Sequence, residues 1–320
     1  MKKNYILLLL LCLCFAGCKE KLVVESDHLP IADPYVMLYE GKYYAYGTGG
    51  TVEGEGFACF SSDDLKNWTR EGQALSAANS YGTWGFWAPE VYYIKSKNKF
   101  YLFYSTEEHI CVATADAPQG PFRQEVKQPI WGEKSIDTSL FIDDDGTPYL
   151  YFVRFTDGNV IWVAEMNDDL TGIKQETLTE CIKAEEPWEL SQDKPAKVAE
   201  GPSVLKKNGI YYLIYSANHF ESKNYGVGYA TSDSPMGPWT KYVGNPILQR
   251  VDELMGTGHG VPFLCKDGSW KYIFHAHWSS TKVQPRTSYI KDFAISDQET
   301  VSIGGSLIRP QVLGSISLEK

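Results

Sequence analysis

Residues that could carry acid–base chemistry recur along this chain at matched places. Each opens a short apolar strand: Asp33 before PYVML, Glu90 before VYYI, Asp137 before TSLFI, Glu200 before GPSVL and His259 before GVPFL. One acid before one strand is ordinary, because turns between strands are polar. Recurrence predicts instead that these side chains meet at one site. Converging carboxylates repel one another and are poorly solvated, which favours a functional site over a stabilising one.

Three of these acids would be enough to cleave a glycosidic bond. That reaction needs one carboxyl group kept protonated for the leaving oxygen and one ionised carboxylate to activate water or attack carbon. A third acid can hold the donor's pKa up by like-charge repulsion. Asp33, Asp137 and Glu200 are therefore the candidate catalytic residues.

The elements that must position these residues come from an internal repeat. Glycine or asparagine turns followed by aromatic-rich strands begin at Gly41, Asn98, Gly146, Gly209 and Gly268. Their spacing of roughly 50 to 60 residues falls in the range of propeller blades. Each follows one of the polar residues named above, so the two strands predict a hairpin. Four units continue into a third strand, and Trp68, Phe122 and Trp239 are expected to begin a fourth.

This pattern predicts an all-β fold, a single five-bladed β-propeller over residues 28–320 with four antiparallel strands per blade. The first strand of each blade lines the central channel, which brings the five polar residues near one mouth of it. Residues 303–313 are expected to add the strand that closes the ring.

The N-terminus predicts export. Residues 1–18 combine a basic start, an apolar run and the small-small-Cys ending Ala16-Gly17-Cys18, as in a signal peptide. The ending resembles a bacterial lipobox, although Phe15 stands where leucine is usual. We expect lipidation at Cys18, a tether over 19–27 and an envelope-anchored protein that touches the membrane only through its lipid. The alternative is an ordinary signal peptide in which Cys18 has no special role.

Composition excludes other classes. Forty acidic residues against thirty basic ones, with no basic run, argue against a nucleic-acid partner. The cysteines after the signal are widely spaced and contain no CxxC pair, which argues against a zinc site. Cys59 and Cys111 fit buried free thiols, and one disulfide in an exported protein stays open.

The local sequences resemble glycoside hydrolase family 43 along nearly the whole mature chain. The motifs that carry the resemblance are ADPYVMLYEGKYYAYGT, WAPEVYY, SIDTSLFIDDDGTPYLYF and AEGPSVLKKNGIYYLIYSAN. The resemblance implies an inverting five-bladed hydrolase of arabinose- and xylose-containing plant polysaccharides.

The same resemblance implies a role for each acid. Asp33 matches the general base, Glu200 the general acid and Asp137 the acid that tunes and orients Glu200. Single displacement then predicts a separation of roughly 6.5 to 9.5 Å between base and acid. Thr138 departs from the proline that usually follows the middle aspartate.

Further site residues also follow from the resemblance. Trp84 and Trp87 match an aromatic wall of the sugar pocket, the alternative being packing between blades. His259 in GTGHG matches a histidine below the site that in some members binds a calcium ion or a water cluster in the channel. No cofactor is expected to be required, and a structural calcium ion held indirectly near His259 is the one candidate ion. Glu90 is expected to face the pocket without an assigned step. Arg286 is expected to reach a sugar hydroxyl or the general acid.

Less specific expectations concern the rim and one turn. The candidate rim residues are Asn218, His219, Tyr225, His275, His277 and Trp278. The run Asp143-Asp144-Asp145-Gly146 predicts a hairpin turn, because Arg154 stands where a calcium loop needs a bidentate glutamate.

The expected activity is that of a monomeric, exo-acting α-L-arabinofuranosidase, with β-D-xylosidase next and endo-arabinanase or galactan hydrolase after it. Gly-Pro after Glu200 resembles the exo-acting members, and the chain ends before the extra β-sandwich of many β-xylosidases. A non-catalytic glycan-binding propeller is the competitor from another class. A glycoside phosphorylase would need more basic residues to hold phosphate.

Overall fold

The computed structural model describes residues 24–51, 53–191, 194 and 196–318. The expected signal peptide, Cys18 and residues 19–23 of the expected tether lie outside this part. Within it, no helix has both the length and the apolar character needed to cross a bilayer.

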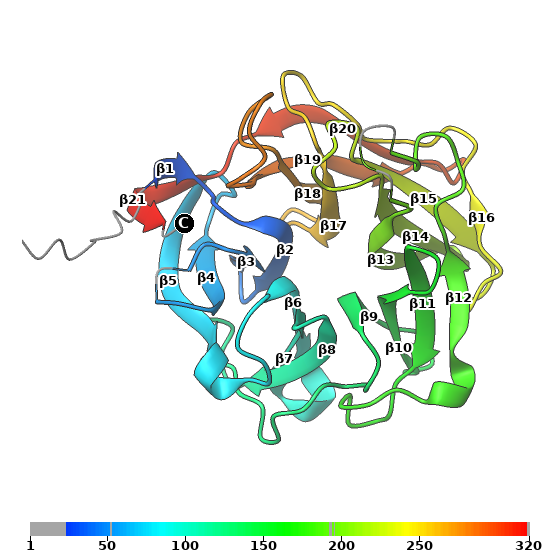
Figure 1. Cartoon of the computed structure of the whole chain (residues 1–320), viewed down its shortest axis with the longest axis horizontal. Helices are drawn as coiled ribbons and strands as arrows, with labels where there is room; N and C mark the ends of the chain where they lie inside the picture. The colour runs from blue at the N-terminus through cyan, green and yellow to red at the C-terminus, as the bar shows by residue number, and fades with distance from the viewer. Residues whose placement is uncertain (1–23, 52, 192–193, 195, 319–320) are drawn as a thin grey trace, which may run out of the picture.

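Five sheets, antiparallel except for one strand pairing in the first blade, stand around a central axis, so the predicted five-bladed propeller is confirmed (Figure 1). The innermost strand of each blade comes first in its hairpin: β2 (Ala32–Tyr39), β6 (Trp87–Ile94), β9 (Ser135–Ile142), β13 (Ala199–Lys207) and β17 (Gly258–Leu264). The second strands are β3 (Lys42–Thr48), β7 (Lys99–Thr106), β10 (Pro148–Phe155), β14 (Ile210–Ala217) and β18 (Trp270–Ala276). The third strands are β4 (Gly56–Ser62), β8 (His109–Ala115), β11 (Asn159–Glu165), β15 (Gly226–Ser232) and β19 (Thr287–Ile295).

The outer strands are less regular than the sequence predicts. Four blades have one: β5 (Asn67–Ser76), β12 (Thr179–Ile182), β16 (Thr240–Lys241) and β20 (Val301–Ile308). The second blade has a three-stranded sheet, and the fourth strand expected from Phe122 is reduced to a single bridge between Thr114 and Arg123. Phe122 is nevertheless fully buried, because its ring packs into the core between the first two blades.

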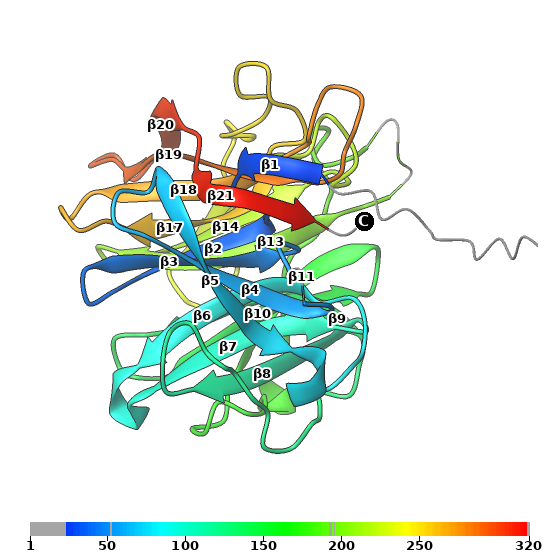
Figure 2. The ribbon, with the colours of Figure 1, turned by 90° about the vertical axis from the view of Figure 1, so that its left-hand side faces the viewer.

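The two ends of the described chain meet in the first blade and close the ring (Figure 2). β21 (Gln311–Leu318) runs antiparallel to β1 (Val24–His28) and parallel to the start of β5. The closing strand is therefore not the single stretch 303–313: β20 completes the fifth blade and β21 joins the first. The sheet also begins at Val24 rather than at residue 28, because β1 pairs along the exposed edge of β21.

Hydrophobic packing between neighbouring blades holds the ring together. Five core clusters lie at the five blade-to-blade contacts, including one between the fifth blade and the first. The repeated aromatic strands supply large members of three of these clusters, the fully buried tyrosines Tyr46, Tyr104, Tyr151, Tyr212 and Tyr272. Burial of each such side chain contributes about 1.5–3 kcal/mol to the free energy of unfolding. The aromatic repeat in the sequence therefore forms part of the core between blades.

Every innermost strand carries the same β-bulge against its second strand. Pairing shifts by one residue between Ala32 and Tyr35, and the equivalent shift occurs in all five blades. The residue that enters the bulge has a left-handed backbone in each case: Asp33 (φ 47°), Ala88 (45°), Asp137 (57°), Gly201 (55°) and His259 (41°). Left-handed φ in a non-glycine residue costs about 1–2 kcal/mol and persists where the surrounding structure fixes the backbone.

The position of the bulge shows that the five polar residues are not equivalent, contrary to the sequence prediction. Asp33, Asp137 and His259 occupy the bulge position itself, whereas Glu200 precedes it by one residue and Glu90 follows it by two. Thr138 falls at the position that holds Pro34, Pro89 and Pro202 in three other blades. The five side chains therefore come from one end of the channel but not from one ring of equivalent positions.

Candidate active site

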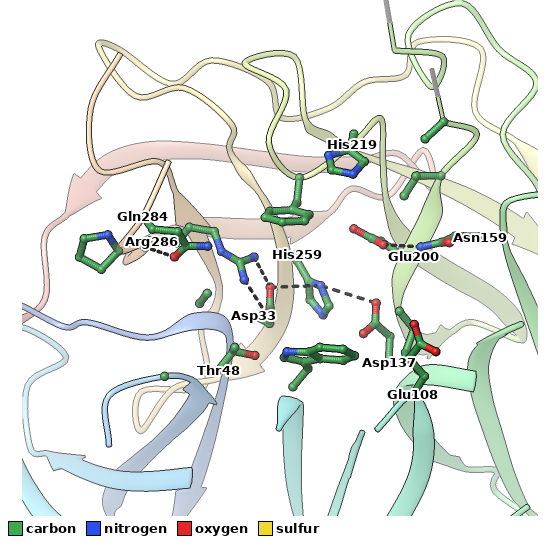
Figure 3. A pocket seen from close by; sticks show the side chains of 18 of the residues that line it. Asp33, Thr48, Glu108, Asp137, Asn159, Glu200, His219, His259, Gln284 and Arg286 are labelled. Carbon is green, nitrogen blue, oxygen red and sulfur yellow. Dashed lines mark hydrogen bonds and ion pairs between the residues drawn. The ribbon is translucent and has the colours of Figure 1, made fainter. Parts of the chain in front are cut away.

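A cavity of about 1260 Å³ opens at this end of the channel. All three candidate acids lie in its lining, together with Trp87, His259 and Arg286. Asp33, Asp137 and Glu200 are 7%, 5% and 8% exposed, so each carboxyl is buried at the floor of the cavity rather than placed on its rim. The sequence prediction that these acids converge is confirmed by their position (Figure 3).

Asp33 is held ionised by a cation. Burial would raise its pKa, but Arg286 and then His259 and His275 oppose that effect and hold the pKa of Asp33 well below its ordinary value. Arg286 donates from Nη1 to Oδ1 at 2.8 Å and from Nη2 to Oδ2 at 3.3 Å, a two-point contact. Of the two contacts expected for Arg286, a sugar hydroxyl or the candidate acid Glu200, the second is not made, because the guanidinium is bound to Asp33.

Glu200 has the opposite electrostatic character. Burial raises its pKa to about 7, and the Asp33 carboxylate adds to the rise, while hydrogen bonds from Tyr225 and Asn159 oppose it. The Tyr225 hydroxyl donates to Oε1 and the Asn159 amide to Oε2, both at 2.8 Å. This side chain can therefore hold a proton near neutral pH in a fixed orientation.

Asp137 is joined to the strand that carries Glu200. Its Oδ2 accepts the backbone N–H of Gly201 at 3.2 Å, and His259 Nδ1 lies 3.8 Å from that oxygen. Burial, the Glu200 carboxylate and the Asp33 carboxylate raise the pKa of Asp137 well above its ordinary value. His259 also stands 3.4 Å from Asp33 Oδ1, and burial lowers its pKa, so a neutral imidazole separates two of the acids (Figure 3).

Glu90 does not face the sugar-sized cavity. It lines a separate space of about 10 Å³ beneath the acids, beside Thr138 and His259. Its carboxyl accepts the hydroxyl of Tyr92, and burial raises its pKa to about 8. The expectation that Glu90 faces the pocket is wrong, because its position two residues beyond the bulge turns it into the channel.

The channel residues do not fit a directly bound calcium ion. Calcium takes roughly six to eight oxygen ligands, whereas this space holds about one water. The described ranges contain no group of three or more His, Cys, Asp or Glu side chains arranged to hold a metal. The hydroxyl of Thr138 is buried there without a hydrogen-bond partner among the described side chains.

The two candidate wall tryptophans are placed differently. Trp87 lines the cavity, while Trp84 is 53% exposed and absent from its lining. Their rings meet edge to face with centroids 6.2 Å apart. Trp84 therefore supports Trp87 from outside the cavity.

Of the six expected rim residues, only His219 lines the cavity. Asn218 bonds the carbonyl of Trp188, and His277 contacts the carbonyl of Phe220 at 2.8 Å. Trp278 packs edge to face on His28. Tyr225 and His275 have no exposed surface and lie beneath the acids. These side chains were misplaced because alternation along a strand does not show how deep a side chain lies in a propeller.

Other expected features agree with the structure. Asp143 to Thr147 form the predicted hairpin turn, with Gly146 N–H donating to Asp143 O at 2.9 Å. Cys59 and Cys111 are buried free thiols, and the described cysteines form no disulfide.

Phe155 and Asn159 are site residues that the sequence reasoning missed. They are cross-strand partners in the β10–β11 hairpin, so both side chains project to the same face. Asn159 bonds Glu200, and Phe155 lines the cavity with 44% of its surface exposed. An exposed phenylalanine beside the candidate acid offers an aromatic face to whatever group is attached there. The aromatic end of YLYFVRF, next to a turn, was the available signal.

Comparison with known proteins defines the class. The family model for glycosyl hydrolases family 43 matches residues 28–301, so this chain belongs to that family and is a glycoside hydrolase.

Individual relatives differ in the activity that their names state. A crystal structure titled endo-1,4-beta-xylanase from Bacteroides thetaiotaomicron VPI-5482 is 77% identical, with TM-score 0.89, over 91% of this chain and 100% of that chain. A beta-xylosidase of Xylanibacter ruminicola is 30% identical over 80% of this chain and 90% of its own length. A beta-D-galactofuranosidase of Aspergillus niger is 28% identical over 77% and 74%.

Proposed function

We propose that this enzyme hydrolyses glycosidic bonds of xylan-type plant glycans with inversion, using Asp33 as the base and Glu200 as the acid. The observation that carries the proposal is the opposite tuning of these two buried carboxyls in one cavity. Two carboxyls whose environments drive their pKa values apart define a base and an acid.

The reaction then runs in one step. Asp33 takes a proton from water as the water oxygen attacks the anomeric carbon. Glu200 gives its proton to the departing glycosidic oxygen as that bond breaks. Asp137 has a positioning role in this scheme, since it holds the backbone N–H that follows Glu200. The separation of roughly 6.5 to 9.5 Å between base and acid stays a prediction.

For the sugar, we propose β-D-xylosyl linkages first and α-L-arabinofuranosyl side groups second. The order reverses the sequence expectation, because the relatives at 77% and 30% identity carry the names xylanase and xylosidase. The cavity of about 1260 Å³ exceeds the usual upper size of about 1,000 Å³ for small-ligand pockets. It supports binding of several sugar units.

The test uses aryl β-D-xylosides, aryl α-L-arabinofuranosides and defined xylo- and arabino-oligosaccharides, with the product anomer followed by NMR. We expect the wild type to release an inverted sugar and Glu200→Gln to lose at least about 100-fold in kcat on substrates with poor leaving groups. Glu125→Gln, an exposed side chain, is the matched control and should keep full activity.

Three outcomes would count against this assignment. Negligible turnover by both wild type and Glu200→Gln, with retained glycan binding, would make the protein a binding propeller. A retained anomer would exclude the water-activating role of Asp33. Turnover that rises strongly with added phosphate would make phosphorolysis the reaction.

We also propose export and lipid anchoring at Cys18, followed by function as a monomer. The support is the basic, apolar and small-small-Cys order of residues 1–18. Labelling of cells with a fatty-acid analogue should mark the wild type and leave Cys18→Ala unmarked. Equal labelling of both would overturn the anchor, and a dimer in light scattering of the mature chain would overturn the monomer.

A further inference from the structure

A stacked pair of buried rings connects the two candidate catalytic carboxyls. Tyr225 and His275 lie nearly parallel, with ring centroids 5.7 Å apart and an interplanar angle of 13°. Neither side chain has exposed surface, so neither can touch a sugar in the cavity.

Each ring holds one of the carboxyl residues. Tyr225 donates its hydroxyl to Glu200 Oε1 at 2.8 Å. His275 Nδ1 lies 3.1 Å from the backbone nitrogen of Asp33 and 3.2 Å from Asp33 Oδ1, and Nε2 lies 3.3 Å from Arg286 Nη1. Burial and the neighbouring guanidinium lower the pKa of His275 to about 3, so the ring stays neutral and can accept at working pH.

A glycine makes room for this stack. Gly258 pairs with His275 across β17 and β18. A Cβ on Gly258 would come within 2.4 Å of Tyr225 Cε1. The φ of Gly258 is not in the left-handed region, so its backbone does not require glycine. The missing side chain therefore has a steric reason, which is the place of the Tyr225 ring.

We propose that Tyr225 and His275 are positioning residues that fix the acid and the base relative to each other. Gly258 leaves the space that the Tyr225 ring of this pair occupies. The stack joins three blades: Tyr225 and Glu200 belong to the fourth, His275 to the fifth and Asp33 to the first. An inverting hydrolase depends on this spacing, because water must fit between the base and the sugar. The inference rests on the proposed function for its kinetic consequences only.

The first test is Tyr225→Phe, which keeps the ring and removes the hydroxyl. Loss of a hydrogen bond to the ionised form raises the pKa of Glu200. We expect the alkaline limb of kcat/KM to move to higher pH and kcat to fall by about tenfold with KM little changed. An unmoved alkaline limb would overturn the role of Tyr225.

The second test is Gly258→Ala in two backgrounds. In the wild type it should lower kcat by about tenfold, because the methyl group displaces Tyr225. In Tyr225→Ala it should have no further effect, because the ring it displaces is gone. Gly304→Ala, in β20 of the same blade with open space around its Cβ, is the matched control and should be neutral. Equal losses from Gly258→Ala in both backgrounds would contradict the inference.

A third measurement separates this inference from the proposed function. Carbon-13 NMR of labelled glutamate carboxyls follows Glu200 without any turnover, with Glu200→Gln assigning its signal. If the wild type hydrolyses nothing, the hydrolase proposal fails, yet the pKa of Glu200 should still rise in Tyr225→Phe. An unchanged titration there would overturn the positioning role in an active or an inactive protein.

Discussion

The Arg286 guanidinium and the Asp33 carboxylate form a two-point ion pair at the floor of the cavity, with side chains 10% and 7% exposed. The same guanidinium lies over the Phe220 ring, 4.8 Å from its centroid. A planar cation that stacks on an aromatic face and donates from its edge to a carboxylate has little freedom to move. Asp33 thus stays ionised and oriented before any substrate arrives.

Arg286→Gln should weaken both activity and stability. Without the guanidinium the pKa of Asp33 rises, so the acidic limb of kcat/KM should move to higher pH. Unfolding free energy at neutral pH should fall by about 3 kcal/mol, because a buried carboxylate loses its main charge partner. Denaturant titration and pH–rate profiles measure the two effects.

The stability loss should depend on pH with a defined sign. A carboxyl whose folded pKa is depressed stabilises the fold above its unfolded pKa of about 4, and this contribution is lost as pH falls. The difference between wild type and Arg286→Gln should therefore shrink below about pH 4. Arg309→Gln, which removes an exposed ion pair with Glu253, should cost less than about 1 kcal/mol. A similar loss from both variants would contradict the special role of Arg286.

The pH–rate profile of the wild type should be level from acid to neutral pH and fall on the alkaline side. In the proposed mechanism Glu200 must be protonated, so kcat/KM should fall as pH rises through about 7. Asp33 must be ionised, and its lowered pKa places the acidic limb well below the usual carboxyl range. Profiles between about pH 3 and about pH 9 measure both limbs. Activity that rises above pH 8 would contradict Glu200 as the acid.

Phe155→Ala should impair substrates with a sugar on the leaving-group side. Removal of an aromatic face beside Asn159 and Glu200 should lower kcat/KM on oligosaccharides by about tenfold. Inhibition by a free pentose, which occupies the other side of the cleaved bond, should not change. Ile142→Ala is the matched control, since this side chain is also 44% exposed in the same blade and does not line the cavity. Weaker inhibition of Phe155→Ala by the pentose would contradict the prediction, because it would place Phe155 on the pentose side of the cleaved bond.

The repeat predicted the blades and the convergence of the three acids, because turn residues and aromatic alternation are local signals. The repeat did not show that the five polar residues occupy different positions relative to the bulge. The bulge shifts Glu200 and Glu90 in opposite directions relative to Asp33 and Asp137. Alignment on the prolines Pro34, Pro89 and Pro202, instead of on the polar residues, would have shown that offset.

The partners of the acids were harder to predict for a different reason. Arg286 and His275 contact Asp33 across more than two hundred residues of sequence, where no periodicity connects them. Tyr225 was expected at the rim, since a tyrosine after a blade strand fits a rim or a core equally well. The position of the Tyr225 ring depends on the missing side chain of Gly258. The sequence does not show that these two residues meet, and only the folded structure does.

Glu90→Gln should stabilise the protein, and more so at higher pH. Burial raises the pKa of Glu90 to about 8, far above its value in an unfolded chain. The contribution of Glu90 to wild-type stability must therefore fall as pH rises from about 4 to about 8, because the unfolded chain releases this proton first. The amide in Glu90→Gln never ionises, so its advantage in thermal midpoint should grow from pH 5 to pH 8. Glu176→Gln, an exposed glutamate, should show no such trend. An advantage that is equal at both pH values would mean that Glu90 is already ionised in the folded channel.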